Sequence, residues 1–412
     1  MQNTSSLIPR PEPLRWLRRW RDRDIIKAVT GVRRCGKSTV LRMFAQELLD
    51  QGVPPGRVVE INLEDPSLSH LTQDHQALYE HIRSRLAPGG TNYVFVDEFQ
   101  NADSFERVVD GLFVLPEVDL YVTGSTSRLL AGPLATLLSG RYVELKLLPL
   151  SFAEYVSAFA GDQTEGAPVP VRDLFDAYTR SGSFPFAIGL SEENQIRQYL
   201  EGIVDTVLFR DVAAARHVAS VAQLRAVTEF VFSNIGNLNS VAGIANTMTS
   251  AGRRVSRPTV ESFLEGLADA HQIYPAPRWD VRGKRLLESG VKHYVVDVGL
   301  RRAILGDRPT DAGRVLENIV YLELLRRGGK THVGKAGAAE IDFVVESSAG
   351  TAHIQVALSV AEAATLRREM APLSAASGAD RRLLLVADRE PPQSIDGVRR
   401  LSVFDWLLGQ AE

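Results

Sequence analysis

The sequence predicts an α/β protein that begins with a parallel β-sheet covered by helices on both faces. Short apolar segments alternate with amphipathic segments from residue 25 to residue 148, which is the pattern of such a sheet. Tyr93–Val96 is an uninterrupted apolar run, typical of a strand buried on both faces. The chain has 412 residues, 44% of them hydrophobic, so it can form about three domains.

The composition excludes several classes of protein. Lys and Arg total 47 against 50 Asp and Glu, so the chain as a whole is not a basic nucleic-acid coat protein, although this average hides local patches. The single cysteine excludes an intrachain disulfide and a cysteine-based zinc site, and it fits a reducing cytosol. No apolar run approaches the roughly 20 residues that span a bilayer, and the arginine-rich N-terminus lacks the apolar part of a secretory signal. We therefore expect a soluble, cytoplasmic protein without membrane contact.

The first predicted domain, residues 1–150, holds the alternating elements. Its expected strands are Ile25–Val29, Val58–Leu63, Tyr93–Val96, Asp119–Thr123 and Tyr142–Leu148. Its expected helices, in which apolar residues recur at helical spacing, are Lys37–Leu49, Ala77–Leu86 and Phe105–Leu115. An amphipathic helix is also expected in the arginine-rich segment from Arg10 to Arg42. That helix either packs on the core or offers a surface to nucleic acid or a partner protein.

A phosphate-binding motif lies between the first expected strand and helix. Gly31-Val32-Arg33-Arg34-Cys35-Gly36-Lys37-Ser38 fits the pattern G-x-x-x-x-G-K-[ST] of the P-loop. Its glycines let backbone N–H groups face phosphate oxygens, and the helix N-terminus adds the positive end of its dipole. The residues expected to bind ATP are Gly31, Arg33, Arg34, Cys35, Gly36, Lys37, Ser38 and Thr39. The alternative is a glycine turn that binds nothing.

Individual roles follow from the motif. Lys37 would reach the β- and γ-phosphates, and the Ser38 hydroxyl would bind Mg²⁺. Because Cys35 is the one cysteine and lies inside the loop, we expect a thiol reagent to block nucleotide binding and ATP to protect against it.

Two carboxylates follow the apolar run. A carboxylate at the end of a buried strand must be hydrated, paired or metal-bound. Asp97 fits the Mg²⁺-associated residue of a Walker B motif, and Glu98 fits a residue that positions the attacking water. At the end of the next strand, Thr126 or Ser125 is placed to sense the γ-phosphate; the alternative is that Ser125 or Ser127 simply caps a helix.

Two arginines are candidates for stabilising the charge that develops during phosphoryl transfer. Arg128 and Arg141 would act within the chain or from a neighbouring subunit, unless they are solvated surface residues. We take Lys37, Glu98, Thr126 and Arg141 as the candidate catalytic residues.

Beyond residue 150 the pattern changes. Residues 151–220 read as a helical lid, residues 221–290 as a winged-helix-like domain and residues 291–412 as a further α/β domain. The winged-helix pattern consists of the helices Val221–Ile235, Ser240–Met248 and Arg257–Ala270 and the wing strands Gln272–Pro275 and Lys284–Leu287. The last domain is expected to hold the helices Leu316–Arg326 and Leu366–Leu373 and the strands Ile341–Val345, His353–Ala357 and Leu383–Ala387.

A winged helix would place its second helix in a DNA major groove. Basic residues in position to contact phosphates are Arg253, Arg254, Arg257, Arg278, Arg282, Lys284 and Arg285. Glu261, Glu265, Asp269 and Asp280 reduce the local excess of positive charge, so the alternative is a structural winged helix or one that contacts a protein.

These motifs together resemble AAA+-type P-loop ATPases of the AAA_14 family, close to the archaeal-type ATPases of the STAND/AAA+ grouping. The stretches that carry the resemblance are residues 30–39, 95–100, 123–127, 140–142, 148–155, 181–185 and 208–211. Thr126 stands where this family usually has Asn. Residues 292–300, 316–318, 340–343 and 354–356 resemble the domain of unknown function that commonly follows this ATPase.

The C-terminal domain also resembles the restriction-endonuclease-like, or PD-(D/E)XK, fold in its acidic residues. In that fold acidic residues hold Mg²⁺, and a lysine two positions after the second acid orients water. Glu317 and Asp342 match, but Gln355 replaces the second acid and Ala357 the lysine, which leaves Lys335 on a nearby loop as a substitute. The resemblance implies either an inactive nuclease fold used for binding or an active nuclease.

The function expected from the sequence is ATP hydrolysis that drives a conformational switch, with closure of the helical lid on the core. The switch would be DNA-associated. The alternatives are a regulatory or signalling ATPase that acts on protein partners without DNA, and a Mg²⁺-dependent nuclease. An oligomer is compatible with an arginine supplied by a neighbouring subunit.

Overall fold

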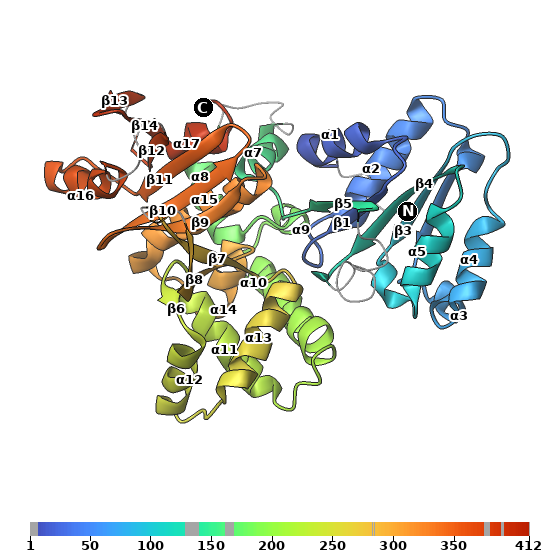
Figure 1. Ribbon diagram of the computed structural model, residues 1–412, viewed down its shortest axis with the longest axis horizontal. Helices are drawn as coiled ribbons and strands as arrows, with labels where there is room; N and C mark the ends of the chain where they lie inside the picture. Colours follow the sequence, from blue (N-terminus) through green and yellow to red (C-terminus); the bar gives the residue numbers. More distant parts are fainter. Residues whose placement is uncertain are drawn as a thin grey trace. The chain divides into compact units, whose positions relative to one another are not determined.

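The computed structural model describes residues 7–127, 140–160, 169–281, 283, 285–374, 380–388 and 391–411 (Figure 1). The chain divides into two compact units, each with one β-sheet. One unit consists of Met1–Pro149 with Asp269–His271, and the other of Leu150–Ala268 with Gln272–Glu412. No helix in the described ranges is both long and apolar enough to cross a membrane.

The sheet of the first unit has five parallel strands in the order β2-β3-β4-β1-β5. The strands are β1 (Ile26–Thr30), β2 (Val58–Asn62), β3 (Asn92–Asp97), β4 (Val118–Gly124) and β5 (Tyr142–Lys146). The helices are α1 (Pro11–Trp20), α2 (Lys37–Asp50), α3 (Ser69–Thr72), α4 (His75–Arg83) and α5 (Phe105–Phe113), with short 3₁₀ turns η1 (Pro55–Arg57), η2 (Pro66–Leu68) and η3 (Phe99–Asn101). The predicted α/β fold with a parallel sheet is therefore confirmed.

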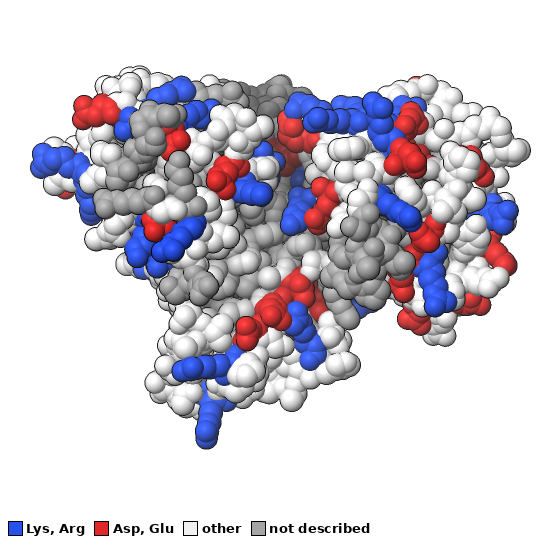
Figure 2. Space-filling view, in the orientation of Figure 1, with Lys and Arg blue, Asp and Glu red and all other residues white. Residues whose placement is uncertain are grey.

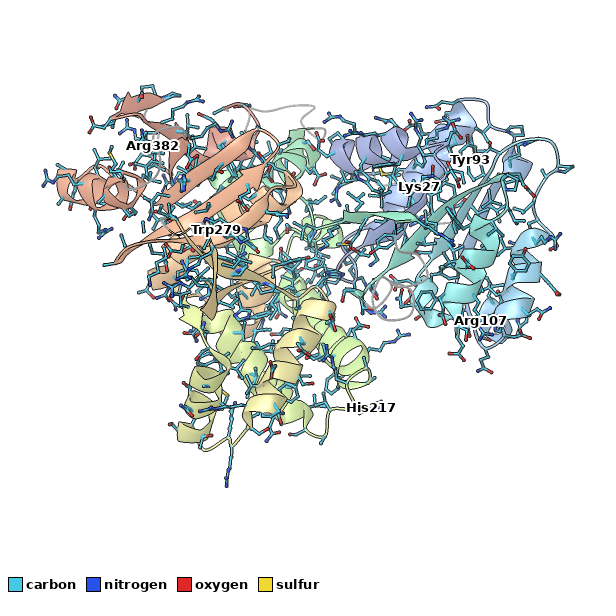
Figure 3. The ribbon with its side chains drawn as sticks, viewed as in Figure 1. Lys27, Tyr93, Arg107, His217, Trp279 and Arg382 are labelled. Atoms are coloured by element: carbon cyan, nitrogen blue, oxygen red, sulfur yellow. The ribbon has the colours of Figure 1, made fainter. Side chains whose placement is uncertain are left out.

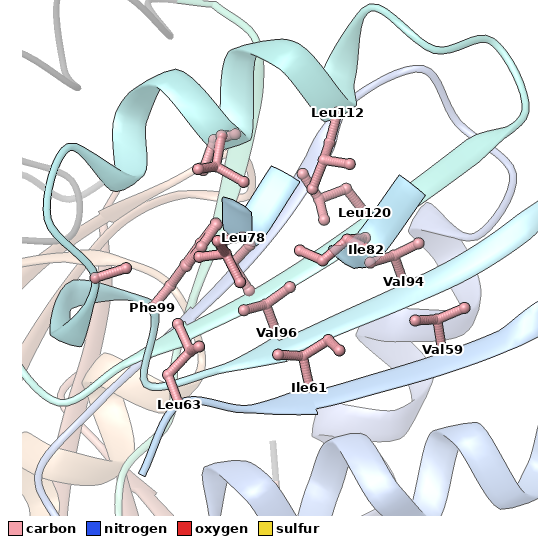
Figure 4. Packing of buried hydrophobic residues seen from close by; sticks show 14 of the residues in the cluster. Val59, Ile61, Leu63, Leu78, Ile82, Val94, Val96, Phe99, Leu112 and Leu120 are labelled. Atoms are coloured by element: carbon pink, nitrogen blue, oxygen red, sulfur yellow. The ribbon is translucent and has the colours of Figure 1, made fainter. Parts of the chain in front are cut away.

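Alternating side chains form one core layer on each face of this sheet. Val94 and Val96 of β3 belong to a cluster with Leu78 of α4 and Leu112 of α5 (Figure 4). The same cluster contains Ile26 of β1, which is separated from β3 by β4. All five are buried. The period-2 apolar pattern thus covers one face, while the next residues along each strand face the other side.

Three rings cover the opposite face of the sheet. Phe95 of β3 and Tyr121 of β4 stack with their centroids 4.8 Å apart, and Phe44 of α2 contacts both at 6.3 and 5.5 Å. Because each strand is apolar on both faces, α2 is held against the sheet next to the P-loop from which it starts.

A buried ion pair fixes the start of β1. The Lys27 ammonium is fully buried, binds Asp119 and donates to the carbonyl of Arg23 at 2.7 Å (Figure 3). Asp119 also accepts from the Tyr121 hydroxyl (2.8 Å) and from the backbone N–H of Asp22 (2.9 Å). Burial lowers the pKa of Lys27, and Asp119 opposes this shift. A buried charge persists only when it is paired in this way.

The strand order determines where a ligand can bind. β1 lies between β4 and β5, and the chain leaves the carboxyl ends of β1, β3 and β4 at the same edge of the sheet. In open parallel sheets, ligands bind outside the carboxyl ends of the strands, where the strand order reverses. The segments that follow these strands are residues 31–36, 98–100 and 125–127.

The second unit contains one nine-stranded mixed sheet in the order β13-β14-β12-β11-β10-β9-β7-β8-β6. The strands are β6 (Leu238–Asn239), β7 (Ile273–Asp280), β8 (Arg285–Val295), β9 (Lys330–Ala336), β10 (Ala339–Ser347), β11 (Gly350–Ala357), β12 (Arg381–Val386), β13 (Gln393–Ile395) and β14 (Val398–Ser402). The helices are α7 (Phe152–Ala160), α8 (Val171–Ser181), α9 (Pro185–Ile188), α10 (Glu193–Thr206), the π-helical η5 (Val207–Ala213), α11 (Val221–Ser233), α12 (Val241–Ser250), α13 (Arg257–Asp269), α14 (Val298–Leu305), η6 (Pro309–Asp311), α15 (Ala312–Arg326), α16 (Ala363–Ser374) and α17 (Val403–Leu407).

The two strands expected to form the wing are longer than the sequence predicts, and they belong to this large sheet. β7 pairs antiparallel with β8 over its whole length and parallel with β9 from Arg278 to Asp280. Pro275 and Pro277 break the strand pattern in the sequence, because proline cannot donate to a ladder. They are tolerated because β7 has only β8 as a partner at these positions. β8 runs across residue 290, where the predicted domains meet.

Two stretches singled out by the sequence pack on each other in the second unit. The Asp297 carboxylate accepts the backbone N–H and the hydroxyl of Ser183, both at 2.6 Å, and the N–H of Leu300 at 2.8 Å. A Cβ on Gly182 would lie 2.5 Å from Asp297 Oδ1, and one on Gly299 would lie 2.5 Å from Gly182 itself. The glycines of both stretches are therefore required by close backbone packing.

His293 in β8 gives a stability prediction. Its side chain is buried, and burial lowers its pKa from 6.5 to about 4. Between these two pH values the unfolded chain takes up a proton that the folded protein does not, so stability is complete above pH 6.5 and falls as the pH drops. We expect His293→Gln to remove a slope of about 1.4 kcal/mol per pH unit in this window.

The measurement is urea unfolding of wild type and variant across the window. His217→Gln, which replaces an exposed imidazole of the same unit, is the control. Parallel pH profiles for wild type and His293→Gln would contradict the assignment.

Candidate functional site

The P-loop has a backbone that only glycine allows at two positions. Gly31 has φ +152°, and a Cβ there would lie 2.1 Å from the carbonyl oxygen of Leu147. Gly36 has φ +103° and begins α2 as its N-cap, and Arg34 also has a positive φ of 67°. This conformation wraps the loop around the start of α2, which is the arrangement that the motif requires for phosphate.

Arg10 holds this loop from outside the motif. Its side chain is buried, and its guanidinium donates to the carbonyls of Cys35 (3.1 Å) and Leu148 (2.9 Å). The sequence shows Arg10 only as one of many basic residues before the loop. The structure gives it a specific role, because it ties the P-loop to the segment that follows β5.

Lys37 and Glu98 face each other in the site. Lys37 Nζ lies 3.3 Å from Glu98 Oε1 and donates to the carbonyls of Gly31 (3.0 Å) and Val32 (3.4 Å). Both side chains are buried, with Lys37 4% and Glu98 6% exposed. Burial alone would raise the pKa of Glu98, but the Lys37 ammonium and the Gln100 amide hold it below its usual range. Glu98 is therefore a carboxylate at neutral pH.

Residues of β4 and the 3₁₀ turn hold the two carboxylates. The Thr123 hydroxyl donates to Asp97 Oδ1 and accepts the backbone N–H of Glu98 at 2.8 Å. The Gln100 amide donates to Glu98 Oε2 (2.5 Å) and to Ser125 Oγ (3.1 Å). Sequence reasoning missed Thr123 and Gln100, although both lie within the stretches that carry the family resemblance.

Thr126 has a buried hydroxyl with no partner in the part of the chain that the structure describes. The residue is 7% exposed and follows β4 at the carboxyl edge of the sheet. A buried hydroxyl without a hydrogen bond is unfavourable unless a ligand supplies one. A phosphate oxygen of a bound nucleotide could supply this hydrogen bond, which is the role predicted for Thr126.

The remaining predicted ligand-binding residues lie around the same loop. Ser38 and Thr39 are half-buried in the first turn of α2, where a hydroxyl can face a cation or a phosphate. Arg33 binds Glu64 at 3.0 Å, and Arg34 is exposed. The donor set of Ser38 and Asp97, a hydroxyl and a carboxylate oxygen, suits Mg²⁺.

Cys35 is not placed as a reactive thiol. Its side chain is completely buried, and a Cβ on Gly31 would lie 3.1 Å from its Sγ. Burial raises the pKa of this thiol, so it stays protonated and poorly nucleophilic. The expectation that a thiol reagent blocks nucleotide binding loses its basis, because the sulfur fills space under the loop instead of facing solvent.

Arg141 does not lie at the phosphate-binding edge. Its carbonyl accepts the N–H of Ile26 at 2.9 Å, which places it at the amino ends of the strands. The P-loop follows the other end of β1, and a five-residue strand spans roughly 16 Å. The Arg141 guanidinium binds Asp110 at 2.9 Å. The catalytic role predicted for Arg141 within its own chain is therefore corrected, and Arg128 lies outside the described residues.

In the second unit, Glu317, Asp342 and Gln355 come together as predicted, but so does a lysine that the sequence did not indicate. Lys292 of β8 binds Glu317 at 2.9 Å. Lys335, the predicted substitute, makes no ion pair among the described side chains. Among all residues that the structure describes, no group of three or more His, Cys, Asp or Glu side chains is arranged to hold a metal ion.

The close approach at Gly31 gives a prediction with a matched control. Gly31→Ala would force a Cβ into the Leu147 carbonyl, so we expect it to abolish nucleotide binding and lower the thermal midpoint. Gly56→Ala adds the same methyl group where nothing lies within 4 Å, and should leave both properties unchanged. The measurements are titration with a fluorescent ATP analogue and thermal unfolding. Wild-type nucleotide affinity in Gly31→Ala would contradict the proposed loop geometry.

Comparisons with known proteins identify the region that contains this site. The family described as AAA domain (AAA_14) matches residues 23–156, and a domain of unknown function (DUF8612) matches residues 172–311. An uncharacterized protein of Haemophilus influenzae is 33% identical over 406 residues, which cover 98% of this chain and 100% of that protein. The uncharacterized protein MJ1544 of Methanocaldococcus jannaschii is 28% identical over 329 residues, 78% of this chain and 72% of that protein.

A solved structure, the Walker-type ATPase PABY2304 of Pyrococcus abyssi, matches with a TM-score of 0.48 and 15% identity over 72% of this chain and 96% of that one. These matches give no support to the nuclease-like resemblance of residues 291–412. The AAA match contains the P-loop, Asp97 and Glu98, as the sequence predicts. Residues 23–156 are therefore an AAA-type P-loop domain, and the chain as a whole belongs to the same family as the Haemophilus influenzae protein.

Proposed function

We propose that this protein hydrolyses ATP at the P-loop and uses the reaction as a conformational switch. The observation that carries the proposal is the buried pair of Lys37 and Glu98, 3.3 Å apart, in front of the loop. The lysine is the group that binds phosphate in any P-loop site, and a carboxylate beside it that can position water favours hydrolysis over nucleotide binding alone.

The Lys37 ammonium has contacts in this structure that phosphate oxygens could replace. Its ammonium has three hydrogen-bonding sites, and here it contacts two backbone carbonyls and Glu98. Phosphate oxygens carry more charge than carbonyl oxygens, so β- and γ-phosphates would compete for the same ammonium. Binding of ATP would then release Glu98 Oε1 from Lys37 and leave Gln100 as its main support.

The reaction follows from this arrangement. The Glu98 carboxylate orients a water molecule and accepts its proton while the water oxygen bonds to the γ-phosphorus. The bond from the γ-phosphorus to the bridging oxygen breaks at the same time, so ADP leaves with that electron pair. Lys37 and the N–H groups of the P-loop stabilise the charge on the phosphate oxygens. The Thr126 hydroxyl, which lacks a partner among the described residues, would contact the γ-phosphate.

Ser38 and Asp97 are the residues that would hold Mg²⁺. When bound, the ion would neutralise charge on the β- and γ-phosphate oxygens. Thr123 positions Asp97 through the hydrogen bond to Oδ1 and so fixes the carboxylate for this role. An arginine that completes the charge stabilisation would be Arg128 or would come from a neighbouring subunit, because Arg141 lies at the other end of the strands.

We further propose duplex DNA as the partner of the second unit. The order α11, β6, α12, α13, β7, β8 is the order of elements in a winged helix, with β7 and β8 as the wing. Arg253 and Arg254 in the turn after α12 and Arg257 at the start of α13 are exposed. None of the three has a carboxylate partner in the described ranges.

The charges on α13 limit where DNA would contact it. Glu261 and Glu265 are exposed further along the helix and would repel phosphates, so contact would be confined to its first turn. Figure 2 shows basic side chains protruding at the lower end of the view, where α12 lies in Figure 1. Arg282 and Lys284 of the predicted wing lie outside the described residues.

Two substitutions test the ATPase proposal. Lys37→Ala should abolish ATP binding, because it removes the cation that contacts the phosphates. Glu98→Gln keeps the size of the side chain but cannot accept a proton, so we expect ATP binding to be retained and kcat to fall by roughly 10²–10⁴-fold. The measurements are nucleotide binding and phosphate release.

Glu60→Gln, an exposed position on β2, is the matched control and should hydrolyse ATP like wild type. Hydrolysis at the wild-type rate by Glu98→Gln would remove Glu98 from the mechanism.

A salt titration tests the DNA proposal. If each of Arg253, Arg254 and Arg257 neutralises one phosphate, replacing all three with Ala should reduce the slope of log K against log salt by about 3. The control, Arg172→Ala, Arg381→Ala and Arg399→Ala together, has the same change in charge at exposed positions of the same unit. Absence of duplex binding by wild type at low salt would instead favour a regulatory ATPase that acts on protein partners.

A further inference from the structure

A charged cluster lies between α15, β8 and β10 in the second unit, away from the residues used above. We define the carboxylate cluster as Glu317 of α15 and Glu340 and Asp342 of β10. The side chain of Lys292 extends from β8 into this cluster, although β9 and β7 separate β8 from β10 in the strand order. Its side chain is 4% exposed, so its ammonium is taken almost completely out of water.

Lys292 binds two of the three carboxylates directly. Its Nζ lies 2.9 Å from Glu317 Oε1 and 2.7 Å from Glu340 Oε1. The Tyr294 hydroxyl, two residues along β8, donates to the same Glu317 oxygen at 2.5 Å. Both carboxylates therefore point at one position, and the ammonium occupies it.

The third carboxylate and the neighbouring amide are engaged by the protein itself. Asp342 Oδ2 accepts the backbone N–H of Val356 at 2.9 Å. Gln355 Oε1 accepts the N–H of Asp342 at 3.3 Å, and its Nε2 donates to Glu369 at 3.0 Å.

We infer that Lys292 is the resident cation of the carboxylate cluster and occupies the position that a divalent metal ion would need. The domain therefore does not bind Mg²⁺ there and does not act as a metal-dependent nuclease. Instead, the ammonium links β8 to α15 and β10 by ion pairs. This inference does not depend on ATP hydrolysis in the first unit.

Electrostatics favours the ammonium over a metal ion in this environment. A metal ion would have to displace Lys292, which would leave a buried charge without its partners. It would also have to compete for Asp342 Oδ2 and Gln355 Oε1, each of which already accepts a backbone N–H. If the Lys292 ammonium is removed, binding of a metal ion becomes favourable, because three acidic side chains would then share a site without a positive charge.

The experiment uses Mn²⁺ as the probe, with nucleotide-free full-length protein and isothermal titration. All proteins carry Ser38→Ala so that metal at the P-loop does not contribute. We expect no Mn²⁺ site that depends on Glu317 in the protein with Lys292. Lys292→Met should gain one Mn²⁺ per chain, and adding Glu317→Gln to it should remove that site. Lys330→Met, at an exposed lysine of β9, should gain none.

Two results would overturn the inference. One is stoichiometric Mn²⁺ binding by the protein with Lys292 that Glu317→Gln abolishes. The other is a Lys292→Met protein with native circular dichroism that gains no Mn²⁺ site. If Lys292→Met does not fold, the comparison of the Ser38→Ala protein with and without Glu317→Gln still decides, because it leaves Lys292 in place.

Discussion

The approach of Gly31 to the Leu147 carbonyl is the constraint on which the nucleotide site depends. It packs the backbone that enters the P-loop directly on the backbone that follows β5, and it leaves no room for a side chain. Arg10 strengthens the contact by binding one carbonyl from each segment. The first unit ends at Pro149, so the segment on which the loop packs is also the last segment of that unit before the chain continues into the second.

Three lysines in the described part of the chain are buried against carboxylates, and their contacts distinguish a structural role from a role in ligand binding. Lys27 and Lys292 are matched by carboxylates and by neighbouring tyrosines that share the same acceptors. Lys37 depends partly on neutral carbonyls, which are weaker partners for an ammonium. Of the three, Lys37 is therefore the one that a more highly charged ligand can displace from its present contacts.

Local patterns in the sequence were sufficient to predict the strands of the first sheet, the P-loop and the positions of Asp97 and Glu98 at the end of a strand. Each of these features depends on a few consecutive residues. The supporting contacts could not be found in this way. Arg10 reaches a carbonyl 138 residues away, and Gln100 and Ser125 meet only because β3 and β4 are neighbours. Arg141 was misassigned although it directly precedes the strand expected from Tyr142, which in a parallel sheet already places it at the amino ends of the strands. The prolines of β7 concealed how far this strand extends beyond Pro275, since only the pairing shows that their missing donors are harmless.

The strand β8 has a consequence for how this family can diversify. It pairs with β6 on one side and with β7 on the other, and β7 in turn pairs with β9. Dividing the chain at residue 290 would cut β8 in two and expose unpaired edges, which promote aggregation. The helices before this strand and the sheet after it therefore cannot be exchanged separately between proteins. Recombination would be expected to move them as one inherited piece.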